Sequence, residues 1–178
     1  MISIRKNIHL LLLSIIILIS ISCNSDDPNN SGTVIDANID IYLKDANGTD
    51  LLSPDNPESL DTDLFRVYYV IDGQEQLVSD PNLDFRDGYG IFPPEGNRDS
   101  YYMRLFLNIE SPEDTTTTIL KYDGSITGTF LSEINNGNGR IPNSTVVTKV
   151  WYNGMVAFDT GLQDGSERLL TIIRAFQT

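Results

Sequence analysis

Apolar and polar residues alternate with a period of two from residue 34 to the end of the chain. In the run 38–44, Ile39, Ile41 and Leu43 alternate with polar neighbours, and the runs 65–71, 101–109 and 169–173 follow the same pattern. Such alternation is typical of strands with one buried face. No window of a dozen residues keeps the apolar stripe of an amphipathic helix. The pattern therefore predicts a single all-β domain over residues 34–178.

Turn signals divide this region into short strands. Asn-Gly or Asp-Gly pairs favour two-residue hairpin turns, in which both central residues take positive φ. They predict hairpins at about 38–53, 64–79, 115–131 and 146–160. Roughly nine or ten strands in a chain of this length favour an antiparallel β-sandwich of immunoglobulin-like character. A small closed β-barrel is the alternative.

The first 22 residues have a different pattern. Arg5 and Lys6 precede an apolar run over 8–21, which ends just before the only cysteine, Cys23. A positive start, a short apolar middle and small residues before a break are the layout of a secretory signal. The run gives about 21 Å of helix, less than the roughly 30 Å of a bilayer's hydrocarbon core. A cleaved signal is therefore favoured over a permanent membrane-spanning helix.

The residues around Cys23 resemble the lipobox of bacterial lipoproteins. The segment is Ile-Ser-Ile-Ser-Cys over 19–23, with Ser22 fitting the pattern and Ser20 standing where leucine is usual. The resemblance implies cleavage before Cys23, a diacylglyceryl thioether on its sulfur and acylation of the new amine. Two or three acyl chains hold a protein stably on a membrane. The alternative is an ordinary signal followed by an unmodified cysteine.

The next residues resemble the export signal of surface lipoproteins in the Bacteroidota. Ser25, Asp26 and Asp27 follow Cys23 closely, and the resemblance implies an outer-membrane lipoprotein exposed on the cell surface. The polar stretch up to Gly32 cannot bury apolar surface and is expected to be a flexible tether. The predicted organisation is a signal peptide (1–22), a lipidated tether (23–33) and one all-β domain (34–178).

Charge and chemistry narrow the possible functions. The chain has a net charge of −13, and without residues 1–22 it has 10 basic and 25 acidic residues, a net charge of −15. Such acidity argues against nucleic acid as a partner. The only histidine is His9 and the only cysteine is Cys23. The region after Cys23 therefore lacks the imidazole and thiol of Ser–His, Cys–His and histidine–metal sites. We expect no catalytic residue, no cofactor and no metal.

Two acidic features of the sequence could form a catalytic or a calcium-binding site. A carboxylate-dependent hydrolase would need a pair of facing acids, and the candidates are Asp84, Asp87, Glu110, Glu133 and Asp159. Asp45, Asn47 and Asp50 partly resemble a calcium loop but lack its full register and its later bidentate glutamate. An ordinary hairpin turn is the favoured interpretation of this segment.

Aromatic and arginine residues suggest a binding surface. The residues opposite the core-facing sets of the 64–71 and 101–109 strands include Arg66, Tyr68, Tyr102, Arg104 and Phe106. If the two strands are neighbours, these side chains gather on one outer face, where rings and guanidinium groups could bind a glycan or peptide. The alternatives are simple strand propensity or a loop that covers this face.

The expected function is that of a non-catalytic binding or interaction module, held on the membrane through Cys23. Its partner would be a glycan, a peptide or an envelope protein. A structural or accessory subunit of an envelope complex is the first alternative, and a carboxylate-dependent hydrolase is the second.

Overall fold

The computed structural model describes residues 34–136, 144–161 and 167–174. The predicted signal peptide, Cys23 and the tether lie outside these residues. Residues Thr33–Thr178 make up a compact unit, separate from Met1–Gly32. None of the helices among the described residues has the length and apolar character to cross a membrane.

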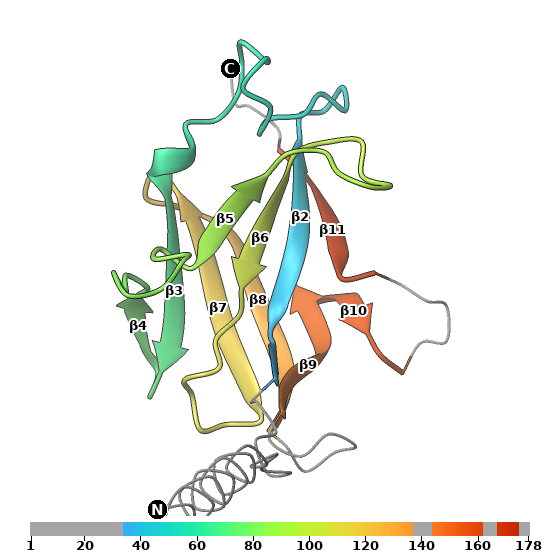
Figure 1. Cartoon of the computed structure of the whole chain (residues 1–178). Helices are drawn as coiled ribbons and strands as arrows, with labels where there is room; N and C mark the ends of the chain where they lie inside the picture. Colours follow the sequence, from blue (N-terminus) through green and yellow to red (C-terminus); the bar gives the residue numbers. More distant parts are fainter. Residues whose placement is uncertain (1–33, 137–143, 162–166, 175–178) are drawn as a thin grey trace, which may run out of the picture. The chain divides into compact units, whose positions relative to one another are not determined.

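The described part of this unit is all-β (Figure 1). Its elements are β1 (Val34–Asp36), β2 (Asn38–Lys44), the short 3₁₀ helix η1 (Thr62–Leu64), β3 (Phe65–Ile71), β4 (Gln74–Leu77), β5 (Tyr89–Phe92), β6 (Tyr102–Phe106), β7 (Thr115–Tyr122), β8 (Ser125–Asn136), β9 (Ser144–Tyr152), β10 (Met155–Asp159) and β11 (Leu169–Ile173).

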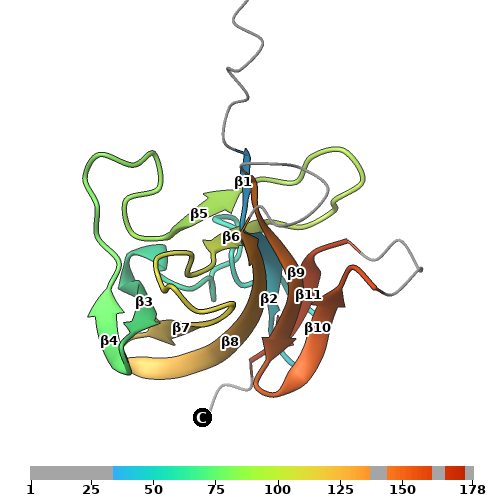
Figure 2. The same cartoon turned by 90° about the horizontal axis from the view of Figure 1, so that it is seen from below.

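These strands form two sheets. The larger sheet has the order β1-β9-β8-β7-β3-β4, with β10 also paired to β9, and the smaller sheet has the order β11-β2-β6-β5. The larger sheet curls into a half-barrel, as the view from below shows (Figure 2). The all-β sandwich predicted from the sequence is confirmed. Because of this curl, the larger sheet resembles part of a β-barrel, the fold that the sequence analysis gives as the alternative.

The core lies between the sheets and follows the predicted alternation. Phe65 and Val67 on β3 face inward and are fully buried, as are Met103 and Leu105 on β6. Because successive side chains of a strand point to opposite faces, one buried face fixes the register of each strand. The predicted inward faces of both strands are therefore confirmed.

Three of the four predicted hairpins are present. β3–β4, β7–β8 and β9–β10 are antiparallel pairs, and Asp72, Asp123 and Asn153 take the positive φ that the turns require. The fourth is reduced to a turn and a single bridge between Lys44 and Asp50. β2 instead pairs with β6 and β11.

Two parallel pairs were not predicted from the turn pattern. β1 runs parallel to the start of β9, and β11 runs parallel to β2. Such pairs join segments far apart in the sequence, so no local turn signal announces them. They bring both ends of the described chain into the sheets.

Candidate functional site

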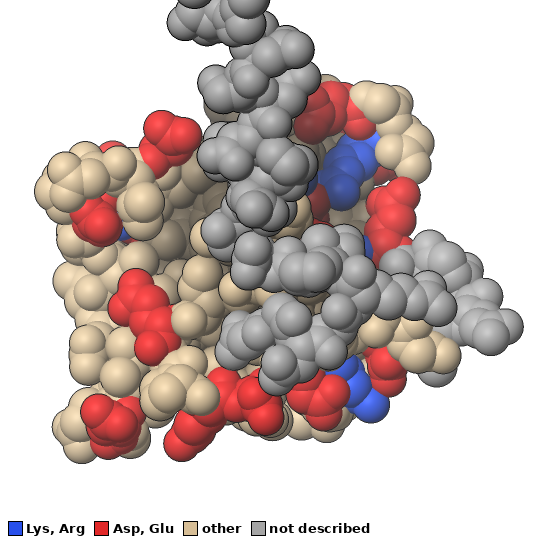
Figure 3. Space-filling view, turned by 60° about the horizontal axis from the view of Figure 1, so that its bottom comes forward, with Lys and Arg blue, Asp and Glu red and all other residues tan. Residues whose placement is uncertain are grey.

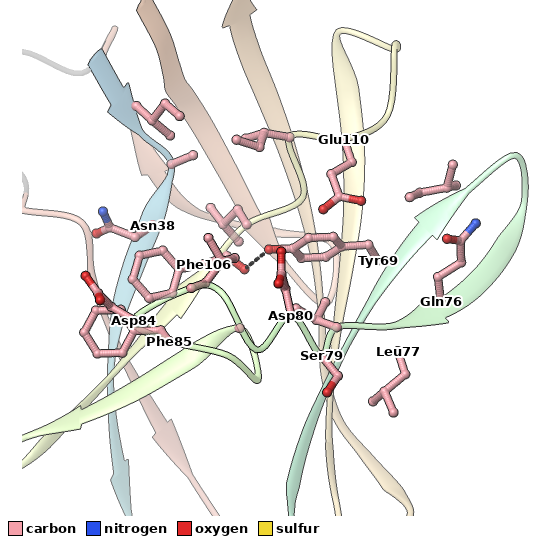
Figure 4. Close-up of a pocket in the computed structure, with 18 residues that line it drawn as sticks. Asn38, Tyr69, Gln76, Leu77, Ser79, Asp80, Asp84, Phe85, Phe106 and Glu110 are labelled. Atoms are coloured by element: carbon pink, nitrogen blue, oxygen red, sulfur yellow. Dashed lines mark hydrogen bonds between the residues drawn. The ribbon is translucent and has the colours of Figure 1, made fainter. Parts of the chain in front are cut away.

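An apolar hollow among the described residues lies between the two sheets at one end of the domain. It has a volume of about 610 Å³, which lies in the range of small-molecule sites, and it is bounded by β3 and β4 of the larger sheet, by the ends of β2 and β6, and by the loop 78–88. We call it the end pocket (Figure 4). Its 18 lining residues are Ile35, Ala37, Asn38, Tyr69, Ile71, Gln76, Leu77, Val78, Ser79, Asp80, Leu83, Asp84, Phe85, Gly88, Phe106, Leu107, Ile109 and Glu110.

Apolar side chains form the floor and walls of the end pocket. Ala37 and Leu107 are buried at its base, while Leu77 and Leu83 are more than half exposed at its mouth. Phe85 belongs to the loop 78–88 and is 36% exposed. A hollow with a buried apolar floor and exposed leucines at its edge could bury the apolar part of a ligand.

Two phenylalanines form one wall of the end pocket. The ring of Phe85 stacks on that of Phe106 with their centroids 5.1 Å apart. Phe106 is the last residue of β6, so its position depends on the sheet, whereas Phe85 reaches it from a loop. Aromatic walls of this kind give a ligand a large contact area at low entropic cost.

Tyr69 places a hydroxyl among these apolar side chains. It faces inward on β3, and its hydroxyl donates a long hydrogen bond of 3.4 Å to the backbone carbonyl oxygen of Phe106 (Figure 4). Burial, followed by the negative charge of Glu110, raises the pKa of Tyr69 to about 12. The hydroxyl therefore stays protonated at physiological pH and can donate to or accept from a ligand.

Acidic side chains border the end pocket. Asp80, Asp84 and Glu110 are among its lining residues, and no described lysine, arginine or histidine is. Figure 3 shows the hollow on this side of the molecule, with red acidic side chains along its border. An apolar hollow with carboxylates at its edge carries a field of one sign, which attracts positive charge.

The lack of a side chain at Gly90 leaves room for the ring of Phe85. A Cβ added at Gly90, in β5, would lie only 2.6 Å from the Phe85 ring. Gly88 lines the pocket and takes a φ of 78°, a conformation that other residues rarely adopt. Gly88 is therefore required for its left-handed backbone, and Gly90 for the space that the Phe85 ring occupies.

The surface predicted from the sequence does not form as one face. Arg66 and Tyr68 lie on β3 in the larger sheet, whereas Tyr102, Arg104 and Phe106 lie on β6 in the smaller sheet. β3 pairs with β4 and β7, and β6 pairs with β2 and β5, so the two strands are not neighbours. The condition for a shared face, that the two strands are neighbours, is not met, because parallel and long-range pairings decide the strand order.

Each half of that set has its own surroundings. Tyr102 is only 1% exposed, because the segment after β5 covers it: its hydroxyl donates to Glu95 at 2.6 Å, and the guanidinium of Arg98 lies 4.2 Å from its ring centre. This is the covering loop that the sequence left open as an alternative. Tyr68 is half-buried beneath Lys121, whose ammonium lies 4.3 Å from the ring centre. Phe106 alone belongs to the end pocket.

Arg104 takes part in a second, polar hollow. Asp40, which is 3% exposed, accepts two hydrogen bonds from Arg104 at 2.8 and 3.1 Å and lies 2.6 Å from Arg98. The hydrogen bonds to Asp40 are the first cause of the raised pKa of Arg104. Arg168 pairs with Asp36 on the same side. The arginines of this hollow are thus held by carboxylates, and the pair of Arg98 with Asp40 ties the segment after β5 to β2.

The acidic candidates fall into different places. Asp84 and Glu110 both line the end pocket, whereas Asp159 pairs with Lys149 at 2.8 Å on β9 and β10, which lowers the pKa of Asp159. Asp45 accepts backbone hydrogen bonds from Asn47 and Thr49 at 2.8 and 2.7 Å, so the turn interpretation of this segment is confirmed. Within the described ranges, no group of three or more histidine, cysteine, aspartate or glutamate side chains could hold a metal ion.

Comparison with known proteins gives no further guide. No family model, no curated protein and no solved structure matches this chain. The function is therefore argued from the sequence and from the geometry of the end pocket.

The end pocket is not predicted by the sequence patterns described above. The alternation over 65–71 places Tyr69 on the same face as Phe65 and Val67, and it says nothing of Phe85, which lies outside the alternating runs. One available signal was the presence of Leu83 and Phe85 in a segment otherwise rich in proline, aspartate and asparagine. Large apolar residues in a polar loop indicate that the loop packs over an apolar surface of the domain.

Proposed function

We propose that this protein is a membrane-anchored, surface-exposed bacterial lipoprotein whose β-sandwich is a non-catalytic binding module. The anchor is Cys23, supported by its position after a signal-like segment and before a polar tether. The observation that carries the binding role is the end pocket: a hollow of about 610 Å³ with an apolar floor, an aromatic wall and the buried hydroxyl of Tyr69. Its occupant is a small molecule with an apolar body.

The absence of imidazole and thiol chemistry supports a non-catalytic role. The sequence has no histidine after His9 and no cysteine after Cys23. The polar groups of the pocket are instead suited to orienting a ligand: Tyr69 at the centre, and Asn38 and Gln76 at the sides (Figure 4).

Calorimetry with a neutral amphiphile tests the binding role. Residues 33–178, which contain the whole described core, are titrated with decyl glucoside below its micelle concentration. We expect one binding site per chain. Replacing Phe85 and Phe106 together by alanine should weaken binding at least tenfold, because it removes both rings of one wall.

The matched control removes apolar surface elsewhere. Leu131, Trp151 and Val156 are cross-strand neighbours on β8, β9 and β10 and face away from the core. The double variant Leu131→Ala/Trp151→Ala should bind as the parent does. Unchanged binding by the Phe85/Phe106 variant would contradict the end pocket as the site. Loss of binding in the control would instead place the site on this outer face, where an accessory subunit could dock.

A carboxylate-dependent hydrolase is the second candidate, because two of the five predicted acids, Asp84 and Glu110, line the same pocket. The two candidates differ in turnover. Release of the chromophore from aryl glycosides, abolished by either Asp84→Asn or Glu110→Gln, would establish hydrolysis; binding without release supports the binding module.

A further inference from the structure

Two carboxylates that line the end pocket have no basic partner among the residues that the structure describes. Asp84 and Glu110 make no side-chain hydrogen bond or ion pair with any residue that the structure describes. Asp80, by contrast, accepts two hydrogen bonds of 2.9 Å from the backbone and side chain of Asn82. Asp80 therefore shapes the loop 78–88, whereas the carboxylates of Asp84 in this loop and of Glu110 after β6 have no such partner among the described residues.

Many basic side chains of the described residues are already paired on other faces. Arg98 and Arg104 are held by Asp40, Lys121 by Glu75 and Lys149 by Asp159. Among the described residues that line the end pocket, none is basic. Within the described part of the chain, negative charge therefore borders an apolar hollow that has no basic lining residue.

The rings of the pocket also suit a cation. Aromatic faces attract ammonium and guanidinium groups through their negative quadrupole. Elsewhere in this domain, such faces already carry a cation: Arg98 lies 4.2 Å from the Tyr102 ring centre, and Lys121 lies 4.3 Å from that of Tyr68. Over the described residues, no lysine or arginine is placed over the rings of Phe85 or Phe106.

We infer that the end pocket selects a small amphipathic cation, with an apolar body against Phe85 and Phe106 and an ammonium or guanidinium group attracted by the carboxylates of its border, where Asp84 and Glu110 lie on opposite sides (Figure 4). The inference rests on the proposed function and adds the charge of the ligand to it. A hollow of this volume holds a ligand of drug-like size. Fatty acids and other amphipathic anions are rejected, because their charge would face the same carboxylates.

A charge series with equal tails tests this inference. Residues 33–178 are titrated by calorimetry with decyltrimethylammonium, decyl glucoside and decanoate at low salt. We expect the cation to bind at least tenfold more tightly than the anion, with the neutral glucoside between them. Raising the sodium chloride concentration to about 0.5 M should narrow the difference, because exposed charges are screened within a few ångströms at that ionic strength.

Isosteric variants separate the pocket's charge from the domain's overall acidity. Asp84→Asn/Glu110→Gln should weaken cation binding about fivefold and leave glucoside binding within about twofold. The control Asp55→Asn/Glu58→Gln removes the same two charges from exposed positions that do not line the pocket. It should leave cation binding within about twofold of the parent.

The outcomes distinguish the two proposals. Equal binding of cation and anion, or an equal loss in the control variant, overturns the inference while the binding role stands. Failure of all three amphiphiles to bind overturns the proposed function and the inference together.

Discussion

At the scale of single residues, Tyr69 carries a hydroxyl at a position of β3 that belongs to the buried face of the strand. Tyr69 continues the inward face of Phe65 and Val67 on β3 and is 8% exposed, yet its hydroxyl has only a long hydrogen bond to a carbonyl oxygen. Burial first, and the charge of Glu110 second, raise its pKa to about 12 from the ordinary 10.0. A buried hydroxyl with one weak partner is suited to making a further bond to a ligand.

The raised pKa of Tyr69 predicts a loss of stability at alkaline pH. Because the unfolded chain releases this proton near pH 10 and the folded chain near pH 12, the contribution is complete below pH 10 and is lost as the pH rises toward 12. The free energy of unfolding of the parent should fall relative to Tyr69→Phe by about 1 kcal/mol between pH 9 and 11. Urea unfolding at several pH values measures this difference. Parallel pH profiles for the two proteins would contradict the assignment.

At the scale of elements, the sequence predicts what is local. The inward faces of β3 and β6 follow from alternation, and the hairpins β3–β4, β7–β8 and β9–β10 follow from Asp-Gly or Asn-Gly turns with positive φ. The turn at Asn47-Gly48 has the same sequence signal but leads into one bridge only. β2 is the element that differs, because β6 and the distant β11 occupy its two edges.

The strand order could not be predicted in the same way. Pairing between β11 and β2, or β1 and β9, depends on which buried faces fit together and not on a turn. The predicted cluster of Arg66, Tyr68, Tyr102, Arg104 and Phe106 depended on that order and therefore failed. The end pocket depends on it as well, since it needs β3–β4 and β2–β6 in opposite layers with the loop 78–88 between them.

At the scale of the whole molecule, the proposed anchor sets where the pocket can act. β1 is the first described strand, and its Ile35 lines the end pocket, so the pocket lies at the end of the domain where the described chain begins. A tether of about 11 residues spans at most about 36 Å when extended. A domain held through Cys23 would therefore keep its pocket close to the membrane and to the amphiphiles found there.

Replacing Cys23 by alanine tests the anchor. We expect the variant to appear in the soluble fraction or to remain as an uncut precursor, because the thioether that carries the acyl chains cannot form. Membrane fractionation, with mass spectrometry of the native N-terminus as the control, measures this. Normal processing and unchanged membrane retention of Cys23→Ala would contradict lipidation.

The most direct measurement of the central claim is an NMR titration of ¹⁵N-labelled residues 33–178 with decyltrimethylammonium below its micelle concentration. If the end pocket takes up an apolar cation, the largest shifts come from Tyr69, Leu83, Phe85 and Phe106, and the side chains of these residues show contacts with the decyl chain. Shifts that instead centre on Leu131, Trp151 and Val156, or that spread evenly over the domain, would contradict it.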